Sequence, residues 1–115
     1  VHFCMNVVTG DDGAASAVLI RALEPLEGIQ VMKRRRGRDA VVDLTSGPGK
    51  LCQALGIDRT LYGHDLSGRP LWIHDDGARR PRHVRTPRIG ISAAADLPYR
   101  YLVPGSACVS RARRI

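Results

Sequence analysis

The chain has 115 residues, and its 18 Lys and Arg against 11 Asp and Glu give a formal net charge of +7 and a pI near 10.2. This balance favours a polyanionic partner, nucleic acid first, over a neutral metabolite. No apolar run approaches the ~20 residues needed to cross a bilayer, so we expect a soluble protein. Three widely spaced cysteines indicate neither a disulfide framework nor a zinc knuckle, and reduced thiols in a cytosolic compartment fit them best.

The first predicted element is an antiparallel hairpin. Phe3 to Val8 and Ala17 to Leu23 are apolar runs on either side of the turn-forming cluster Thr9 to Gly13. Arg21 falls inside the second run. Because a guanidinium stays charged and is costly to desolvate alone, a half-buried arginine there needs an anionic partner.

Two short helices are predicted next. The first begins at Pro25, which suits a first helical turn, carries apolar residues at three-residue spacing, and ends at Gly37. The second has Ser46-Gly47 at its cap, Pro48 in its first turn and Gly56 as its stop. Free N–H groups and the helix dipole make the start of this second helix a candidate phosphate site.

Three strand-like runs follow, at residues 71–74, 85–92 and 99–103, separated by Gly, Pro and Asp. Short strands mixed with two short helices predict the α+β class, with a single domain around a curved antiparallel sheet.

Seven short segments, in order, resemble the alkyladenine (3-methyladenine) DNA glycosylase family. They are Asn6–Gly10, Ile20–Gly28, Ser46–Leu55, Pro87–Ser92, Pro98–Tyr101, Gly105-Ser106 and Val109-Ser110. The resemblance covers nearly the whole chain. It implies a single mixed domain similar to the C-terminal domain of methionyl-tRNA formyltransferase, from which a β-hairpin projects into the DNA minor groove. Because the chain opens at Val1, in the middle of that domain, we expect residues 1–115 to be the C-terminal part of one glycosylase domain.

The resemblance implies base-excision repair. The expected reaction flips an alkylated purine such as 3-methyladenine out of double-stranded DNA and hydrolyses its N-glycosidic bond, without a cofactor. The general-base Glu of the family would lie upstream of Val1, so these 115 residues alone are expected to be inactive. The implied protein is a monomer, cytoplasmic and nucleoid-associated in a bacterium or nuclear in a eukaryote. A basic nucleic-acid-binding module without catalysis is the alternative.

Three residues match the family's active site. Asn6 matches a pocket Asn that clashes with the exocyclic amino group of undamaged guanine, although a strand-end Asn bonded to its own turn is the structural alternative. Arg21 matches an Arg that helps to hold the nucleophilic water and the adjacent phosphate, although an ion pair with Glu24 or Glu27 would also satisfy it. Ile89 matches the position whose backbone carbonyl completes the water site, and a core strand residue would look the same.

Four residues are expected at the DNA backbone. Gly47 and Lys50 match the helix-start phosphate contact, and Gly90 would permit close backbone approach, either to a phosphate or to a neighbouring strand. His2 lies beside the family's wedge Tyr, although a frayed terminal residue is an equal alternative. Departure from the Gly-x4-Gly-Lys-Ser/Thr spacing excludes a Walker A loop.

The remaining candidates for chemistry are weak. His64-Asp65 and His74-Asp75-Asp76 match no metal-site spacing, so no metal is expected. Cys52 stands in no recognisable arrangement with a histidine, which favours packing over nucleophilic catalysis.

Overall fold

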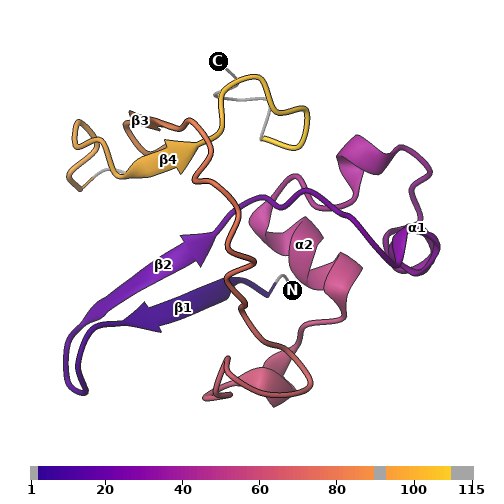
Figure 1. The fold of residues 1–115 in the computed structure, drawn as a ribbon, viewed down its shortest axis with the longest axis horizontal. Helices are drawn as coiled ribbons and strands as arrows, with labels where there is room; N and C mark the ends of the chain where they lie inside the picture. Colours follow the sequence, from indigo (N-terminus) through magenta and orange to yellow (C-terminus); the bar gives the residue numbers. More distant parts are fainter. Residues whose placement is uncertain (1–2, 90–92, 110–115) are drawn as a thin grey trace. The chain divides into compact units, whose positions relative to one another are not determined.

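A computed structural model describes residues 3–89 and 93–109 of the chain. It confirms the α+β class, with the element order β1, β2, α1, α2, β3, β4 and short 3₁₀ turns at Val41–Asp43 and Arg59–Leu61 (Figure 1). The chain divides into two compact units, one within residues 1–58 and 105–115 and the other within residues 59–104. No helix in the described ranges is long and apolar enough to cross a membrane.

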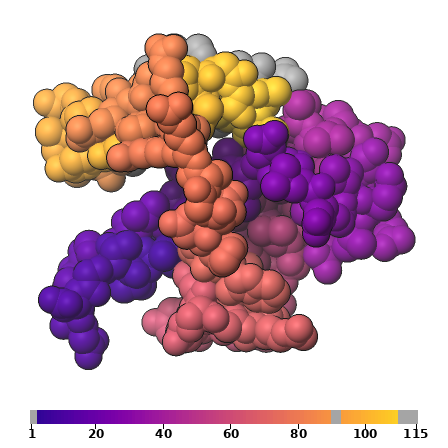
Figure 2. All heavy atoms as spheres, in the orientation of Figure 1, coloured from indigo at the N-terminus to yellow at the C-terminus, as the bar shows by residue number. Residues whose placement is uncertain are grey.

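The predicted hairpin is confirmed. Strand β1 (Met5–Thr9) pairs with β2 (Ser16–Ile20) in antiparallel register, from Met5 opposite Ile20 to Thr9 opposite Ser16. The connection uses left-handed backbone at Gly10 (φ 80°) and Gly13 (φ 90°), conformations that glycine adopts without a Cβ penalty. In Figure 2 the turn end of the hairpin is an indigo arm that no helix of its own unit covers.

Strand β2 ends at Ile20, three residues before the predicted end at Leu23. The backbone after Ile20 leaves the hairpin and bonds to Thr45 instead. The Leu23 N–H donates to the Thr45 carbonyl at 3.1 Å, and the Thr45 hydroxyl donates to the Leu23 carbonyl at 2.6 Å. Thr45 is almost fully buried, so these two bonds fix the exit of the hairpin against the segment that leads into the second helix.

Both helices are present, and the first begins later than predicted. Helix α1 spans Ile29–Arg36. Gly28, directly before it, adopts a left-handed conformation (φ 70°), so the helix does not extend back to Pro25 as predicted. Its predicted end is confirmed, since Gly37 (φ 64°) donates its N–H to the Lys33 carbonyl at 2.8 Å. Helix α2 spans Pro48–Leu55, as the cap and stop residues predicted.

The core of the first unit lies between the two helices. Leu44, Met32 and Ala54 are buried together, and Ile29 and Leu55 pack against them. Burial of a Leu-sized side chain contributes about 1.5–3 kcal/mol relative to exposure. This cluster therefore holds α1, the 3₁₀ turn before Leu44 and α2 in one packed body.

Two arginines of the basic run at residues 33–38 stabilise this body. Arg36 donates to the Leu44 carbonyl (Nε, 3.1 Å), to the Asp43 carbonyl (Nη2, 3.0 Å) and to Gln53 Oε1 (Nη1, 2.7 Å). Arg35 Nη1 donates to the Ala54 carbonyl at 3.0 Å. These contacts satisfy acceptors near the end of α2 and the turn before it, so Arg35 and Arg36 are structural cations.

Replacing Gly56 with alanine is expected to destabilise the protein by about 1–2 kcal/mol, the cost of left-handed backbone for a residue with a Cβ. Gly56 (φ 70°) ends α2, and its N–H caps carbonyls of Cys52 and Gln53. An added Cβ would also lie 3.2 Å from Arg35 Cζ. Gly37→Ala is the matched control, because Gly37 has similar backbone and nothing within 4 Å. Urea denaturation should show the larger loss for Gly56→Ala, and equal losses would contradict a contact with Arg35.

The second unit contains one small hairpin. Strand β3 (Val84–Thr86) pairs antiparallel with β4 (Arg100–Leu102), with Arg85 opposite Tyr101. The described residues thus hold two two-stranded sheets in place of the single curved sheet that we predicted. The strands predicted at 85–92 and 99–103 shrink to these three-residue pairs, and residues 90–92 lie outside the described ranges.

The strand predicted at residues 71–74 is wrong. In the described part of the chain this segment pairs with no strand, and the Ile73 N–H donates instead to the Leu66 carbonyl at 2.9 Å. Trp72 and Ile73 are more than half exposed, so their apolar character does not mark a buried strand. His64 organises the loop, with its Nε2 2.9 Å from the Gly68 carbonyl and 2.6 Å from the Leu71 carbonyl.

Candidate functional site

Asn6 lies in the middle of the β1–β2 hairpin, directly opposite Leu19. Opposite residues of an antiparallel pair share one face, so Asn6 and Leu19 lie on one side and Val7 and Val18 on the other. The Asn6 side chain is exposed and makes no hydrogen bond with any residue of the described ranges. The alternative of an Asn bonded to its own turn is therefore not found there, and the amide is open to an external group.

Arg21 is the first residue after strand β2, which pairs with the strand that carries Asn6. Arg21 is half-buried, yet within the part of the chain that the structure describes it has no hydrogen bond or ion pair, with Glu24 or Glu27 or with any other residue. A partly desolvated guanidinium without an internal acceptor is suited to bind an external anion or a polarised water.

Gly47 and Lys50 lie together at the start of α2. Gly47 is extended (φ −171°) and its carbonyl accepts the first helical bond, from the Leu51 N–H at 2.9 Å. No side chain caps this end, so the N–H groups of the first turn are left for another acceptor. Lys50 is exposed in that turn and adds a cation beside these donors. The start of α2 therefore has the donors and the charge that a phosphate requires.

The other predicted site residues fall elsewhere. Ile89 belongs to the second unit, just after β3, and is half-buried. The structure therefore places Asn6 in β1, Arg21 directly after β2, and Gly47 and Lys50 at one helix end, and it describes Ile89 within its own unit. His2 and Gly90 lie outside the described residues.

Arg88, directly before Ile89, lies within the Pro87–Ser92 match, and the sequence analysis assigned it no role. Its Nη2 donates to the Ala93 carbonyl at 3.2 Å, and its guanidinium carbon lies 5.5 Å from the centre of the Tyr99 ring. Its Nε is buried and has no hydrogen-bond partner among the described residues. Arg88 thus contacts Ala93 and Tyr99, two residues that follow the segment 90–92. The Pro-Arg-Ile-Gly match contained Arg88, but nothing in a single sequence distinguishes its contacts from those of the neighbouring arginines.

Comparison with known proteins decides the family. A profile of the family described as Methylpurine-DNA glycosylase (MPG) matches residues 1–107. The chain belongs to this family. The resemblance carried by the seven sequence segments is thereby confirmed.

Curated relatives agree with the methylpurine-DNA glycosylase family. A protein of Methanoculleus marisnigri, named "Putative 3-methyladenine DNA glycosylase", is 50% identical over 115 residues, covering 96% of this chain and 60% of its own length. Relatives with the same printed name come from Rubrobacter xylanophilus (48% identity, 100% of this chain, 60% of the relative) and Rhodopseudomonas palustris (50%, 96% and 55%). The chain spans 55–60% of the length of these relatives.

Cys52 is built into the core of this methylpurine-DNA glycosylase family member. It lies on α2 and is only 1% exposed. Burial, and next the nearby Cys4 thiol, raise the pKa of Cys52, so its thiolate is scarce at neutral pH. Among the described residues, no group of three or more His, Cys, Asp or Glu side chains could hold a metal ion.

The thiols should therefore differ in reactivity. Iodoacetamide at pH 7.5 is expected to label exposed Cys4 at least tenfold faster than Cys52, because Cys52 is buried and its raised pKa lowers the thiolate fraction. Mass spectrometry of peptides over time measures both rates. In urea the two rates should converge, and fast labelling of Cys52 in the folded protein would contradict the buried position.

Proposed function

We propose that this chain forms part of a monofunctional DNA glycosylase that removes alkylated purines, such as 3-methyladenine, from double-stranded DNA. Membership of the methylpurine-DNA glycosylase family and the names of its relatives support the proposal. The net charge of +7 supports a DNA partner. In this proposal residues 1–115 are one part of a single mixed domain similar to the formyltransferase C-terminal domain, acting as a monomer without a cofactor.

One observation of the structure carries the proposal furthest. Half-buried Arg21 has no internal acceptor in the described ranges and directly follows the strand that pairs with the strand of Asn6. A cation and an exposed amide are the two polar groups needed to hold a phosphate or water and to test the shape of a base.

The proposed reaction assigns each group a step. The damaged nucleotide leaves the stack, and Asn6 rejects undamaged guanine by contact with its exocyclic amino group. Arg21 holds a water in line with the N-glycosidic bond, and the family resemblance assigns the Ile89 backbone carbonyl a role toward the same water. A Glu from sequence upstream of Val1 accepts the water proton, the oxygen bonds to the sugar carbon, and the purine departs with the bonding electrons. The products are the free base and an abasic site.

Backbone contacts would position the DNA. The uncapped start of α2, with Gly47 and Lys50, is proposed to bind a phosphate, and His2 and Gly90 are proposed as further contacts. Lyase chemistry would require an amine nucleophile. The two lysines of the chain, Lys33 and Lys50, lie in a basic helix end and at this phosphate site, so hydrolysis is the favoured reaction.

Alkaline cleavage tests the proposed function. The protein as encoded, with whatever sequence flanks residues 1–115, is incubated with a labelled duplex treated with a methylating agent. Strand breaks at purines that form only after alkali are expected, because hydrolysis leaves an intact abasic site. Breaks before alkali would show lyase activity, and bound DNA without breaks would assign the chain to the alternative, a basic nucleic-acid-binding module without catalysis.

Asn6→Ala is expected to weaken discrimination between alkylated and normal purines. Removing the amide removes the clash with guanine, so release of undamaged guanine should rise about tenfold relative to release of 3-methyladenine, equivalent to ~1.4 kcal/mol. Chromatography of bases released from untreated and methylated DNA measures the ratio. Val8→Ala is the control, because Val8 lies on the same face two residues away and is 76% exposed. An unchanged ratio for Asn6→Ala would remove Asn6 from the pocket.

A further inference from the structure

The outward face of the β3–β4 hairpin carries cations paired with aromatic rings. The guanidinium carbon of Arg85 lies 5.2 Å from the ring centre of Tyr101, its cross-strand partner. The His83 ring stacks on the same tyrosine, with centroids 6.1 Å apart and an interplanar angle of 27°. Arg88 lies over Tyr99 at 5.5 Å. We name these five residues, His83, Arg85, Arg88, Tyr99 and Tyr101, the Arg–Tyr face.

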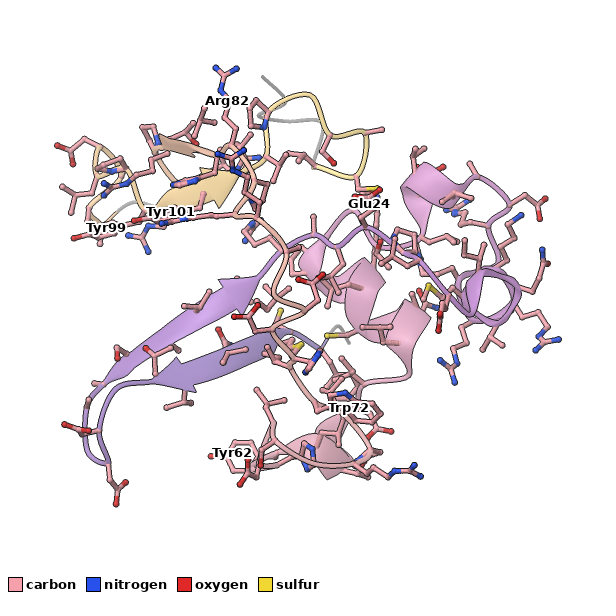
Figure 3. The ribbon with its side chains drawn as sticks, in the orientation of Figure 1. Glu24, Tyr62, Trp72, Arg82, Tyr99 and Tyr101 are labelled. Atoms are coloured by element: carbon pink, nitrogen blue, oxygen red, sulfur yellow. The ribbon has the colours of Figure 1, made fainter. Side chains whose placement is uncertain are left out.

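The rings of this face are not core residues. Tyr99 is 56% exposed and Tyr101 is 59% exposed, whereas Leu102 and Arg100 on the other face of β4 are 8% and 6% exposed. Figure 3 shows Tyr99 and Tyr101 along one side of the hairpin, with Arg82 projecting from the chain before β3, away from both rings. The inner face of the hairpin is thus packed and the Arg–Tyr face is left open.

The cation–π contacts place Arg85 and Arg88 over the tyrosine rings, while Tyr99 and Tyr101 remain more than half exposed. Stacking platforms next to arginines are the combination by which proteins bind single-stranded nucleic acid, because every base has a π-face and every nucleotide has a phosphate. None of the five residues is acidic. The chemistry of the face therefore fits a polyanion that also presents flat aromatic groups.

Spacing decides between a duplex and an unpaired strand. Residues two apart along an extended chain are about 6.8 Å apart, so Tyr99 and Tyr101 are separated by roughly twice the ~3.4 Å between stacked bases of a duplex. Bases lying on both rings must be unstacked from each other, and a duplex does not offer its base faces. We propose that the Arg–Tyr face binds an unpaired nucleic-acid strand, with bases stacked on Tyr99 and Tyr101 and phosphates at Arg85 and Arg88.

This inference goes beyond the proposed function, because excision requires a damaged duplex and the Arg–Tyr face requires neither damage nor pairing. The test uses fluorescence anisotropy of the whole chain with a labelled, undamaged 15-nucleotide oligothymidylate. Tyr101→Ala is expected to weaken binding about fivefold to a hundredfold, the effect of losing one base–aromatic stack. Tyr101→Phe should bind like the original chain, since the ring is kept. A protein without excision activity could still give this result, so the two proposals fail separately.

Matched variants exclude general effects. Tyr62→Ala removes a tyrosine that is 95% exposed and outside the face, and it should change affinity less than twofold. Arg85→Gln should lower the slope of log affinity against log salt by about 0.7, as expected for one single-strand phosphate contact, and Arg82→Gln by less. Equal losses for Tyr101→Ala and Tyr62→Ala would overturn the proposal. Tighter binding of an undamaged duplex, unaffected by Tyr101→Ala, would also overturn it.

Discussion

Replacing Leu44 with alanine is expected to destabilise the protein by about 3–5 kcal/mol. Leu44 is 0% exposed and lies in the cluster that joins α1 to α2, together with Met32 and Ala54. Its backbone carbonyl also accepts a hydrogen bond from Arg36. Truncation would leave a cavity among side chains that two helices and an arginine hold in place, so little relaxation can fill it.

Urea denaturation followed by circular dichroism measures this loss, and Leu26→Ala provides the control. Leu26 is 80% exposed before α1, so its truncation should change the free energy of unfolding by less than about 0.5 kcal/mol. Similar losses for the two leucines would mean that the cluster around Leu44 does not hold the first unit together. Thr45 directly follows Leu44 in the sequence, so truncation of Leu44 should also weaken the buried hydrogen bond between Thr45 and Leu23.

Replacing Arg21 with glutamine is expected to slow single-turnover base release about a hundredfold, the usual effect of removing one preorganised hydrogen-bond donor from a charged transition state. Arg21 is half-buried, without an internal acceptor in the described ranges, and directly follows the strand that pairs with the strand of Asn6. Its cost of desolvation would be offset only when an anion or a held water is present. Rapid quench of the protein in excess over a methylated duplex measures the rate.

Charge alone should not reproduce this effect. Arg38→Gln removes one positive charge from an exposed residue just after α1 and should leave the release rate within twofold. Both variants are expected to bind DNA more weakly at low salt and with a shallower dependence on salt, since each removes one cation. A release rate that is equal in the two variants would remove Arg21 from the water site.

Helices and strands whose ends are marked by capping or turn residues could be predicted from the sequence. Helix α2 was predicted almost to the residue because Pro48 fixes its first turn and Gly56 adopts the left-handed conformation at its end. The β1–β2 hairpin was predicted because the turn-forming cluster Thr9 to Gly13 separates two apolar runs. In both cases the information is local, within a few residues of the boundary.

Elements decided by distant partners could not be predicted. Strand β2 stops at Ile20 because Leu23 bonds to Thr45, a residue 22 positions away. Residues 71–74 are apolar enough for a strand but find no partner strand in the described part of the chain. The start of α1 is set locally, by the left-handed conformation of Gly28. Because glycine occurs both inside and outside helix ends, its presence in the sequence did not show that the helix begins after Gly28 and not at Pro25.

The candidate site shows the same division. Arg21 stood out because a charged residue in an apolar run is costly without a partner, and the structure shows no partner for it among the described residues. Arg35 and Arg36 looked like their basic neighbours, and only the fold shows that they bond to carbonyls of the same unit. The pairing of Arg85 with Tyr101 likewise depends on a strand register that joins residues 16 positions apart.

The most direct test of the proposed chemistry is to identify what leaves the DNA. The protein as encoded is incubated with methylated duplex DNA, the DNA is removed, and the soluble fraction is analysed by mass spectrometry. Free 3-methyladenine, released in step with abasic sites and about a hundredfold more slowly by Arg21→Gln, is the predicted result. DNA binding that persists without any free base would contradict excision and leave the chain as part of a nucleic-acid-binding protein.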